Sequence, residues 1–257
     1  MTHLTIATPA VQFSDGPPLG KFAPLGGSAA HEVASVGALI FDMDGTMIDS
    51  MPYHAKSWVE FTRRHGIDLD VDDLMRRTTG RTGAECMAEL FGRVIEPGEA
   101  SLLIAEKEGI YRELFAPVFK QVAGFNAFSE LAFAKGLKVG VGTAGDRHNI
   151  AFAFSHLKMD RKPHEVVGGD EGFAGKPNPD IFLEVARRLH VKPEHCVVFE
   201  DAPFGIEAAK RAGMKAVAIL SSHSALDLSG PHVLASARNF EELIELKFLE
   251  KLHAVTA

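Results

Sequence analysis

Two aspartates two positions apart, Asp42 and Asp44, directly follow a short apolar run. Side chains at alternate positions leave the end of a strand on the same side, so the two carboxylates are expected to lie together. One carboxylate of such a pair can attack phosphorus, while the other protonates the leaving oxygen and later activates water. Gly45 permits the sharp turn that this arrangement requires. An Asp-rich turn that caps a helix would have the same composition.

A hydroxyl residue among small residues, Thr143 followed by Ala144, ends another apolar run. A hydroxyl group and neighbouring backbone N–H groups at a strand end can hold phosphate oxygens. The alternative is a plain turn into a helix capped by Asp146, a residue type that favours this position.

Lys176 stands on a loop braced by prolines, between Gly175 and Pro177. An ammonium group there would offset the repulsion between a carboxylate nucleophile and a phosphate. A lysine of the solvated surface is the alternative for this position taken alone.

Two adjacent acids, Glu200 and Asp201, follow a further apolar run. Carboxylate oxygens are the ligands that Mg²⁺ prefers, and burying such acids without a cation would cost free energy. An acidic surface loop is the alternative. Together the four motifs supply a nucleophile, a proton carrier, a phosphate clamp, a neutralising cation and metal ligands, and this joint pattern is much more specific than any one motif.

The elements that must position these residues alternate between strands and helices. Short runs that are apolar on both faces predict strands of a buried parallel sheet at 38–41, 137–141, 165–167, 196–199 and 215–219. Helix signals lie between them: Asn178 as an N-cap before Pro179, and a helix over 205–212 that Gly213 stops. The pattern predicts an α/β fold, a doubly wound Rossmann-like parallel sheet.

One segment interrupts the alternation. Residues 52–122 show helical periodicity, for example at Ala55, Trp58 and Val59, and no convincing strand. We predict a helical cap domain there, inserted after the first strand, with a catalytic core over 35–51 and 123–257. Residues 1–34 are rich in Pro, Gly, Ala and Ser and are predicted to form an irregular arm.

The four motifs resemble the signature of the haloacid dehalogenase superfamily, over roughly residues 36–245. The runs 49–58 and 199–214 look like the subfamily that contains β-phosphoglucomutase and sugar-phosphate phosphatases. The resemblance implies that Mg²⁺ is held by Asp42, the backbone carbonyl of Asp44, and Glu200 or Asp201. Phosphate and water would complete the metal shell, and Thr143, Ala144 and Lys176 are expected to bind the phosphate.

Two further residues enter through this resemblance. His54 matches a histidine at the start of the cap, which implies a role in cap closure or in orienting Asp44; a local hydrogen bond at a helix start is the alternative. Arg81 belongs to an Arg- and Thr-rich run, 76–82, that is expected at the mouth of the site and could clamp an anionic group of the substrate. A solvated face is the alternative for these arginines. Where β-phosphoglucomutases carry a further arginine, this chain has Gly83 and Ala84.

Bulk properties exclude several classes. The net charge of −7 argues against a nucleic-acid binder, and no apolar run approaches the roughly 18 residues of a membrane helix. Two distant cysteines indicate neither a zinc site nor a disulfide scaffold, so the cytoplasm is the expected location. The expected partner is a small phosphorylated metabolite, and the expected state is a monomer or weak homodimer.

The function predicted from the sequence is hydrolysis of a small phosphorylated metabolite, such as a sugar phosphate, by a Mg²⁺-dependent phosphatase that forms an aspartyl-phosphate. A phosphomutase of the β-phosphoglucomutase type would use the same first step. A binding protein without activity and a true dehalogenase are weaker alternatives, because all four motifs are intact and the second acid is present.

Overall fold

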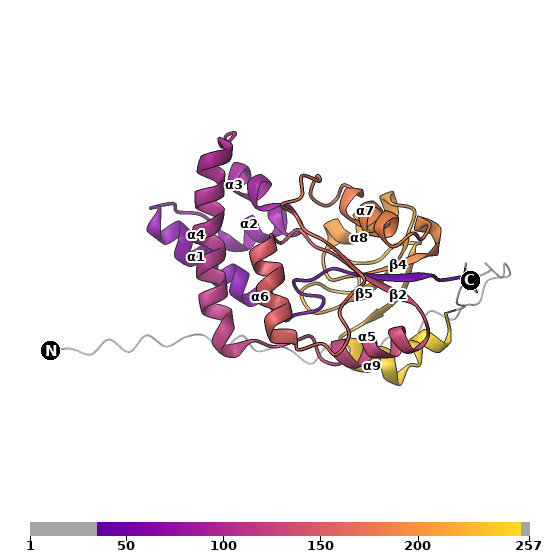
Figure 1. Cartoon of the computed structure of the whole chain (residues 1–257). Helices are drawn as coiled ribbons and strands as arrows, with labels where there is room; N and C mark the ends of the chain where they lie inside the picture. Colours follow the sequence, from indigo (N-terminus) through magenta and orange to yellow (C-terminus); the bar gives the residue numbers. More distant parts are fainter. Residues whose placement is uncertain (1–34, 253–257) are drawn as a thin grey trace. The chain divides into compact units, whose positions relative to one another are not determined.

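The computed structural model describes residues 35–252, so the predicted arm over 1–34 lies outside the described residues. A six-stranded, all-parallel sheet lies at the centre, with strand order β3-β2-β1-β4-β5-β6 (Figure 1). The strands are β1 (Ala38–Phe41), β2 (Lys138–Gly142), β3 (Glu165–Val167), β4 (Cys196–Glu200), β5 (Lys215–Ile219) and β6 (Val233–Ala237). The predicted doubly wound α/β fold is confirmed.

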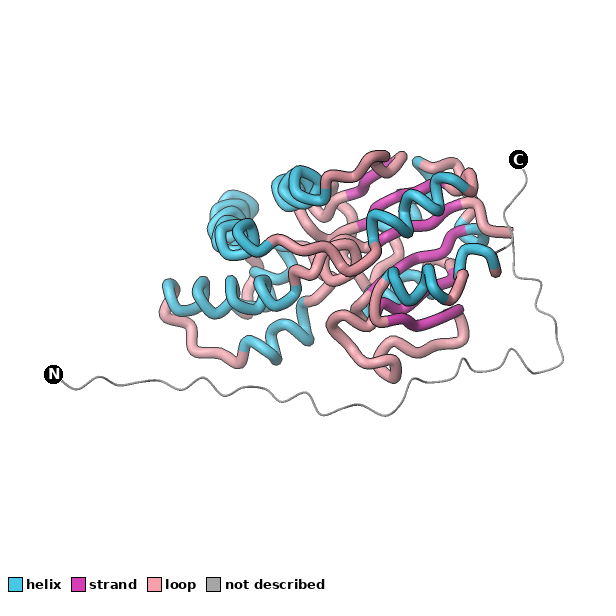
Figure 2. Tube along the Cα trace, turned by 90° about the horizontal axis from the view of Figure 1, so that it is seen from below, coloured by secondary structure: helices cyan, strands magenta, loops and turns pink. Residues whose placement is uncertain are grey.

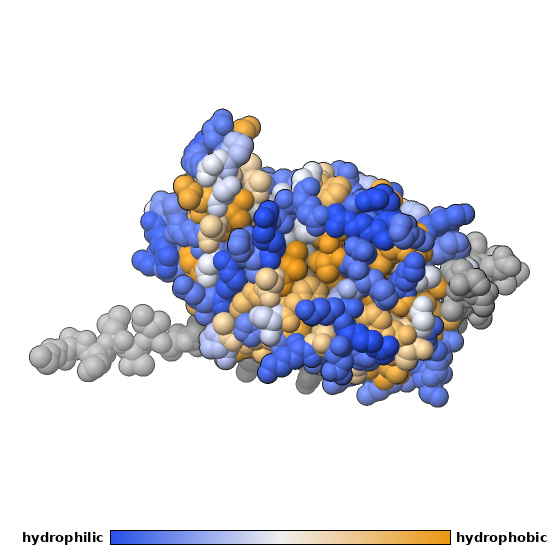
Figure 3. Space-filling model, in the orientation of Figure 1, coloured by the Kyte–Doolittle hydropathy of each residue, from blue (hydrophilic) through white to orange (hydrophobic). Residues whose placement is uncertain are grey.

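Helices cover both faces of the sheet (Figures 1 and 2). One face packs against α5 (Phe125–Ala134), α6 (Arg147–Leu157), α9 (Phe240–Glu245) and the short η3 (Phe248–Glu250). The other packs against α7 (Asp180–Arg188) and α8 (Pro203–Arg211), with η2 (Pro193–His195) before β4. The surface shown in Figure 3 is mostly hydrophilic, with hydrophobic side chains in separate groups, as expected for solvent-facing sides of amphipathic helices.

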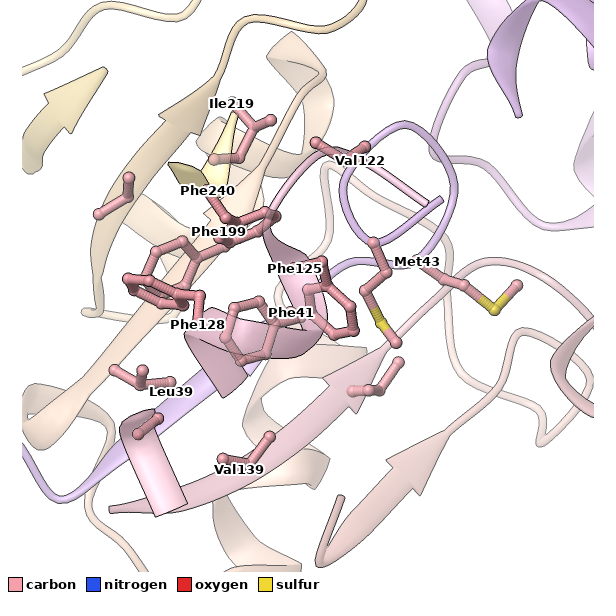
Figure 4. Close-up of a cluster of buried hydrophobic side chains, with 14 of the residues drawn as sticks. Leu39, Phe41, Met43, Val122, Phe125, Phe128, Val139, Phe199, Ile219 and Phe240 are labelled. Carbon is pink, nitrogen blue, oxygen red and sulfur yellow. The ribbon is translucent and has the colours of Figure 1, made fainter. Parts of the chain in front are cut away.

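The alternation of side chains along each strand divides the core in two. In β1, Leu39 and Phe41 face one core, whereas Ala38 and Ile40 face the other. The first core is rich in aromatic rings, and Phe41 stacks on Phe199 with ring centroids 4.7 Å apart (Figure 4). Because both faces are buried, these strands read as continuous apolar runs, which is why the sequence reveals them.

Four of the five α-helices between β1 and β2 form a separate layer beyond the end of the sheet (Figure 1). They are α1 (Met51–Arg64), α2 (Val71–Thr78), α3 (Gly83–Phe91) and α4 (Pro97–Phe115), followed by η1 (Ala116–Val118). They bury a small core of their own around Trp58 and Phe61, and we call residues 51–118 the helical insert. None of the helices within 35–252 combines the length and the hydropathy that crossing a bilayer demands.

The strand predicted at 137–141 lies at 138–142 (β2), and the helix predicted over 205–212 spans 203–211 (α8). Three further details differ from the sequence prediction. β6 was not predicted, because it is an edge strand whose residues are only partly buried and include Ser236. Helix α7 begins one residue later than expected, with Pro179 rather than Asn178 at the N-cap; the Asn178 side chain donates to the Gly175 carbonyl instead. Val59 is 54% exposed, so the apolar stripe of α1 is narrower than its spacing suggests.

Close packing of α7 on β2 depends on Gly140, which yields a first prediction. A Cβ atom there would overlap the Val185 side chain and lie 3.0 Å from Leu189 Cδ1. We expect Gly140→Ala to lower the free energy of unfolding by about 1–3 kcal/mol, as overpacking of a core does. Urea denaturation measures this.

Gly109 on α4 provides the matched control, because a Cβ atom there would meet nothing within 4 Å. Gly109→Ala should raise the free energy of unfolding by about 0.5–1 kcal/mol through helix propensity. The same sign for both substitutions would contradict the packing argument.

Candidate active site

The predicted motifs meet at the carboxyl edge of the sheet, because all six strands are parallel and end on one side. Asp42 directly follows β1, and Asp201 directly follows β4, its neighbour in the sheet. One carboxylate oxygen from each of Asp42, Glu200 and Asp201 lies within 4.8 Å of the other two, and the three side chains are buried. Residues more than 150 positions apart in the chain therefore share one site.

Lys176 lies between two of these acids. Its ammonium group donates to Asp42 Oδ1 and, at 2.8 Å, to Glu200 Oε1, and the residue is only 1% exposed. Burial lowers the pKa of Lys176, but the two carboxylates more than offset this effect, so the pKa is raised and the side chain is charged. The sequence offered an exposed lysine as the alternative, and the structure places Lys176 in the interior.

The charges of this cluster do not balance without a further cation. The Lys176 ammonium neutralises one of three carboxylates. Burial, followed by the Glu200 carboxylate, raises the pKa of Asp42 to about 7 even though Lys176 lowers it. Burial and the neighbouring Glu200 and Asp42 also raise the pKa of Asp201 well above its usual value. Three converging oxygen donors with excess negative charge are the environment that a hard divalent cation suits, so these residues fit a metal ion.

Glu200 and Asp201 are held in different ways. Glu200 Oε2 accepts from the backbone N–H groups of Asp201 and Ala202, both at 2.8 Å, while Lys176 occupies Oε1. Asp201 accepts from two hydroxyl groups, those of Thr46 and Ser222, which can rotate toward other acceptors. Asp201 is therefore the more available metal ligand, and Glu200 fixes Lys176.

Gly45 shapes the turn between the two aspartates of the first motif. It has a φ of 79°, and a Cβ atom would overlap the Asp201 carboxylate. Glycine is required here for its backbone conformation and for the close approach of the Asp201 carboxylate.

Asp44 lies in a polar pocket beside this cluster. Its Oδ1 accepts from Ser50 at 2.7 Å and from Tyr111 at 3.3 Å, and it lies 3.0 Å from His54 Nε2. Burial raises the pKa of Asp44. The charge and hydrogen bond of His54, together with the hydrogen bond of Ser50, lower this pKa by more than burial raises it, so the net shift is downward. His54 thus contacts Asp44 directly, as one of its two predicted roles requires.

Two contributors from α4 were missed by the sequence analysis. Tyr111 stacks on His54 with ring centroids 3.8 Å apart, and Lys107 Nζ lies 2.8 Å from His54 Nδ1. Both residues are buried on one face of a helix at i, i+4 spacing. The available signal was a lysine on the apolar face of the helix, which indicates a charged group with a buried partner.

The Thr143 motif borders the same site. The buried Thr143 hydroxyl accepts from the Gly145 N–H at 3.0 Å, and Asp146 caps α6 by accepting from two backbone N–H groups. The two predicted interpretations of this motif therefore do not exclude each other. The motif forms a turn into a capped helix, and it also lies beside the acids. Thr143 and Ala144 line the cavity above the acids.

The cavity has a volume of about 760 Å³, large enough for a small metabolite. Six of the predicted site residues line it along with the Thr143 motif: Asp42, Asp44, His54, Arg81, Glu200 and Asp201. Arg81 lies over the Phe204 ring, 5.6 Å from its centroid, and 3.4 Å from Glu89. Arg76 and Arg77 do not line the cavity; they pair with Asp73 on the surface of α2.

The loop of the helical insert that carries Arg81 is bonded to the loop that carries Lys176. The Lys176 N–H donates to the Gly80 carbonyl at 3.1 Å, and the Gly175 N–H donates to Glu85 Oε1 at 3.3 Å. Glu85 is fixed in turn by a capping box with Thr82 at the start of α3. The insert and the sheet are thus joined at the position of the buried lysine.

Comparison with known proteins identifies relatives of the same kind. The chain is 34% identical to the fructose-1-phosphate phosphatase YqaB of Escherichia coli over 70% of this chain and 94% of that protein. It is 32% identical to the validoxylamine A 7'-phosphate phosphatase of Streptomyces hygroscopicus over 76% of this chain and 91% of the relative. The crystal structure of β-phosphoglucomutase from Clostridium difficile matches with a TM-score of 0.71 at 25% identity, covering 84% of this chain and 98% of that one.

A family model described as haloacid dehalogenase-like hydrolase matches residues 36–213, which include all four motifs. The predicted family and the predicted hydrolase class are both confirmed. This chain belongs to the haloacid dehalogenase-like hydrolase family.

Proposed function

We propose that the protein is a Mg²⁺-dependent phosphatase that hydrolyses a small phosphorylated metabolite, a sugar phosphate, through an aspartyl-phosphate on Asp42. The observation that carries this proposal is the cluster of Asp42, Lys176, Glu200 and Asp201 beneath a cavity. The Asp42 carboxylate, which would be the nucleophile, lies beside the Lys176 ammonium and in a group of acids that suits a divalent cation. Phosphatases acting on phosphorylated carbohydrates and related compounds among the relatives support the substrate class.

In the first step, a carboxylate oxygen of Asp42 attacks phosphorus and the bond from phosphorus to the leaving oxygen breaks. Asp44 donates its proton to that oxygen, and the alcohol departs. The lowered pKa of Asp44 favours its ionised form in the free enzyme. The negative charge of an arriving phosphate raises the pKa of a nearby carboxyl group, which would load Asp44 with the proton it must donate.

In the second step, Asp44 removes a proton from water, and the water oxygen attacks phosphorus. The bond from phosphorus to Asp42 breaks, which regenerates the carboxylate and releases inorganic phosphate. The Ser50, His54 and Tyr111 groups that contact Asp44 orient it for both transfers.

The remaining predicted residues bind the phosphate and the metal. Thr143 and the backbone N–H of Ala144, together with Lys176, would hold the phosphate oxygens. Asp42, Asp201 and the Asp44 carbonyl, supported by Glu200, would hold Mg²⁺, which neutralises charge on the phosphate as the nucleophile approaches. We further propose that residues 52–122 act as a cap domain over a core of 35–51 and 123–257, with Arg81 at the mouth.

We place the enzyme in the cytoplasm as a monomer or weak homodimer that acts on a free metabolite, not on nucleic acid or a membrane. A phosphomutase remains the second candidate, since a β-phosphoglucomutase has the same fold and shares the first step. Release of inorganic phosphate from a monophosphate, without a bisphosphate activator, distinguishes hydrolysis from transfer.

Removal of the nucleophile should abolish turnover. We expect Asp42→Asn to reduce hydrolysis of phenyl phosphate in Mg²⁺ on the order of 10³-fold or more, because an amide cannot form the phospho-enzyme. Asp72→Asn, on the exposed surface of α2, is the matched control and should retain full activity. Comparable activity in the two variants would contradict the role of Asp42.

Removal of the proton carrier should have a different result. We expect Asp44→Asn to slow turnover about 10²–10⁴-fold, because both proton transfers lose their carrier. Since hydrolysis of the intermediate is slowed, intact-protein mass spectrometry after mixing with substrate should detect one added phosphoryl group. The double variant Asp42→Asn/Asp44→Asn should lack it, and its presence there would assign the nucleophile elsewhere.

The metal requirement can be tested by thermal stability as well as by turnover. Mg²⁺ at a hundredfold excess over its Kd should raise the free energy of unfolding by about 2.7 kcal/mol, seen as a higher Tm. Asp201→Asn should lose most of this shift, whereas Asp72→Asn should keep it. Full activity after chelation of divalent cations would refute the metal-dependent mechanism.

A further inference from the structure

The wall of the cavity away from the acid cluster is polar and comes from two elements. Glu108 and Arg112 belong to α4 of the helical insert, and Asn149 belongs to α6 beside the sheet; all three line the cavity. In Figure 1, α4 and α6 run side by side. None of these residues was assigned a role by the sequence.

Hydrogen bonds fix the orientation of each group in this wall. The Asn149 amide donates through Nδ2 to Glu108 Oε2 at 2.7 Å and accepts at Oδ1 from Arg112, also at 2.7 Å. Lys107 Nζ donates to Glu108 Oε1 at 2.8 Å. Burial raises the pKa of Glu108. The charges of Lys107 and, to a smaller extent, His54 lower this pKa by more than burial raises it, so the side chain is a carboxylate near neutral pH.

Glu108 keeps the capacity to accept more hydrogen bonds. A carboxylate offers about four lone-pair sites, and the Lys107 and Asn149 bonds use two of them. Its side chain is 14% exposed, and it borders the cavity. A preformed, ionised acceptor facing a cavity suits a ligand that brings hydroxyl donors.

The same wall is poorly suited to a second phosphate. Of the four Lys and Arg side chains among residues 35–252 that line the cavity, three are paired with a carboxylate. The pairs are Lys107 with Glu108, Arg81 with Glu89, and Arg147 with Asp170. The fourth, Arg112, donates to the amide that is bonded to Glu108. A phosphate at this wall would face the Glu108 carboxylate and would have to compete with these acids for cations.

We infer that Glu108 is a specificity-determining residue that accepts hydrogen bonds from hydroxyl groups of the substrate, with Asn149 as its positioning residue. The site then selects monophosphates of polyhydroxylated compounds and rejects those with a second phosphate at the far end. This inference rests on the proposed phosphatase function and deepens it. It also counts against the phosphomutase, which must grip a second phosphate.

The test compares three kinds of phosphate ester in Mg²⁺ for the full-length protein. The first is the best substrate among fructose 1-phosphate, glucose 6-phosphate and glucitol 6-phosphate; the second is phenyl phosphate, which lacks hydroxyl groups; the third is fructose 1,6-bisphosphate. Hydrogen bonds to a charged group predict that kcat/KM is roughly tenfold to a hundredfold higher for the hydroxylated monophosphate than for phenyl phosphate. We expect kcat/KM for the hydroxylated monophosphate to exceed that for fructose 1,6-bisphosphate at least about tenfold.

Glu108→Gln removes the charge and keeps the shape. We expect it to reduce both preferences by about tenfold, mainly through a higher KM for the hydroxylated substrate. Glu113→Gln, an exposed Glu of the same helix outside the cavity lining, is the control and should leave both ratios unchanged. Asn149→Ala should shift the ratios in the same direction, and it decides the matter if Glu108→Gln lowers the Tm so far that the protein is unfolded.

Three outcomes are distinguishable. A wild-type protein that turns over phenyl phosphate but shows equal kcat/KM for all three esters overturns the inference and leaves the phosphatase function standing. A Glu108→Gln variant that loses activity by the same factor on every ester also overturns it, because the residue would then only join α4 to α6. A protein that hydrolyses none of the esters removes the proposed function itself, and the inference with it.

Discussion

The burial of the Lys176 ammonium among the carboxylates of Asp42, Glu200 and Asp201 is the interaction on which the site depends. Removing ions from water costs several kcal/mol for each, so such a group persists only where partners lie at close range. One ammonium does not neutralise three carboxylates, and the residual negative charge is what a divalent cation would offset in the mechanism proposed above. The charge balance of this cluster therefore matters both for the stability of the buried groups and for the proposed chemistry.

The fold meets this requirement through parallel strands that end at one edge. β1 and β4 are neighbours, so the residues that follow them are brought together without long loops. The backbone N–H groups at the start of α8 hold Glu200, and Glu200 with Asp42 holds Lys176. Each acid is thereby fixed by a group of the scaffold, which limits the reorganisation that catalysis would need.

The sequence was most informative where one physical factor dominates. Strands buried on both faces carry apolar residues at nearly every position, so β1 and β5 were predicted with their observed bounds. The two valines of the edge strand β3 also marked its place, whereas the half-exposed β6 was not predicted. The motifs of Asp42–Asp44 and Glu200–Asp201 lie at strand ends and keep short spacings. Lys107, Tyr111 and Ser222 reach the site from helices and loops elsewhere, so their roles depend on packing that no local pattern encodes. Glu108 is similar: on a linear sequence it is one of several acids of α4.

The bonds between the loops of Gly80 and Lys176 have a consequence for the order of events in a catalytic cycle. A movement of the helical insert that widens the mouth of the cavity must break two hydrogen bonds. One runs from the Lys176 N–H to the Gly80 carbonyl, and the other from the Gly175 N–H to the Glu85 carboxylate. Breaking these bonds would free the backbone of the loop that carries Lys176, whose ammonium group bonds to Asp42 and Glu200. Movement of the insert and the position of the Lys176 backbone are therefore coupled, so a ligand enclosed beneath the insert would meet Asp42 with its lysine partner in place.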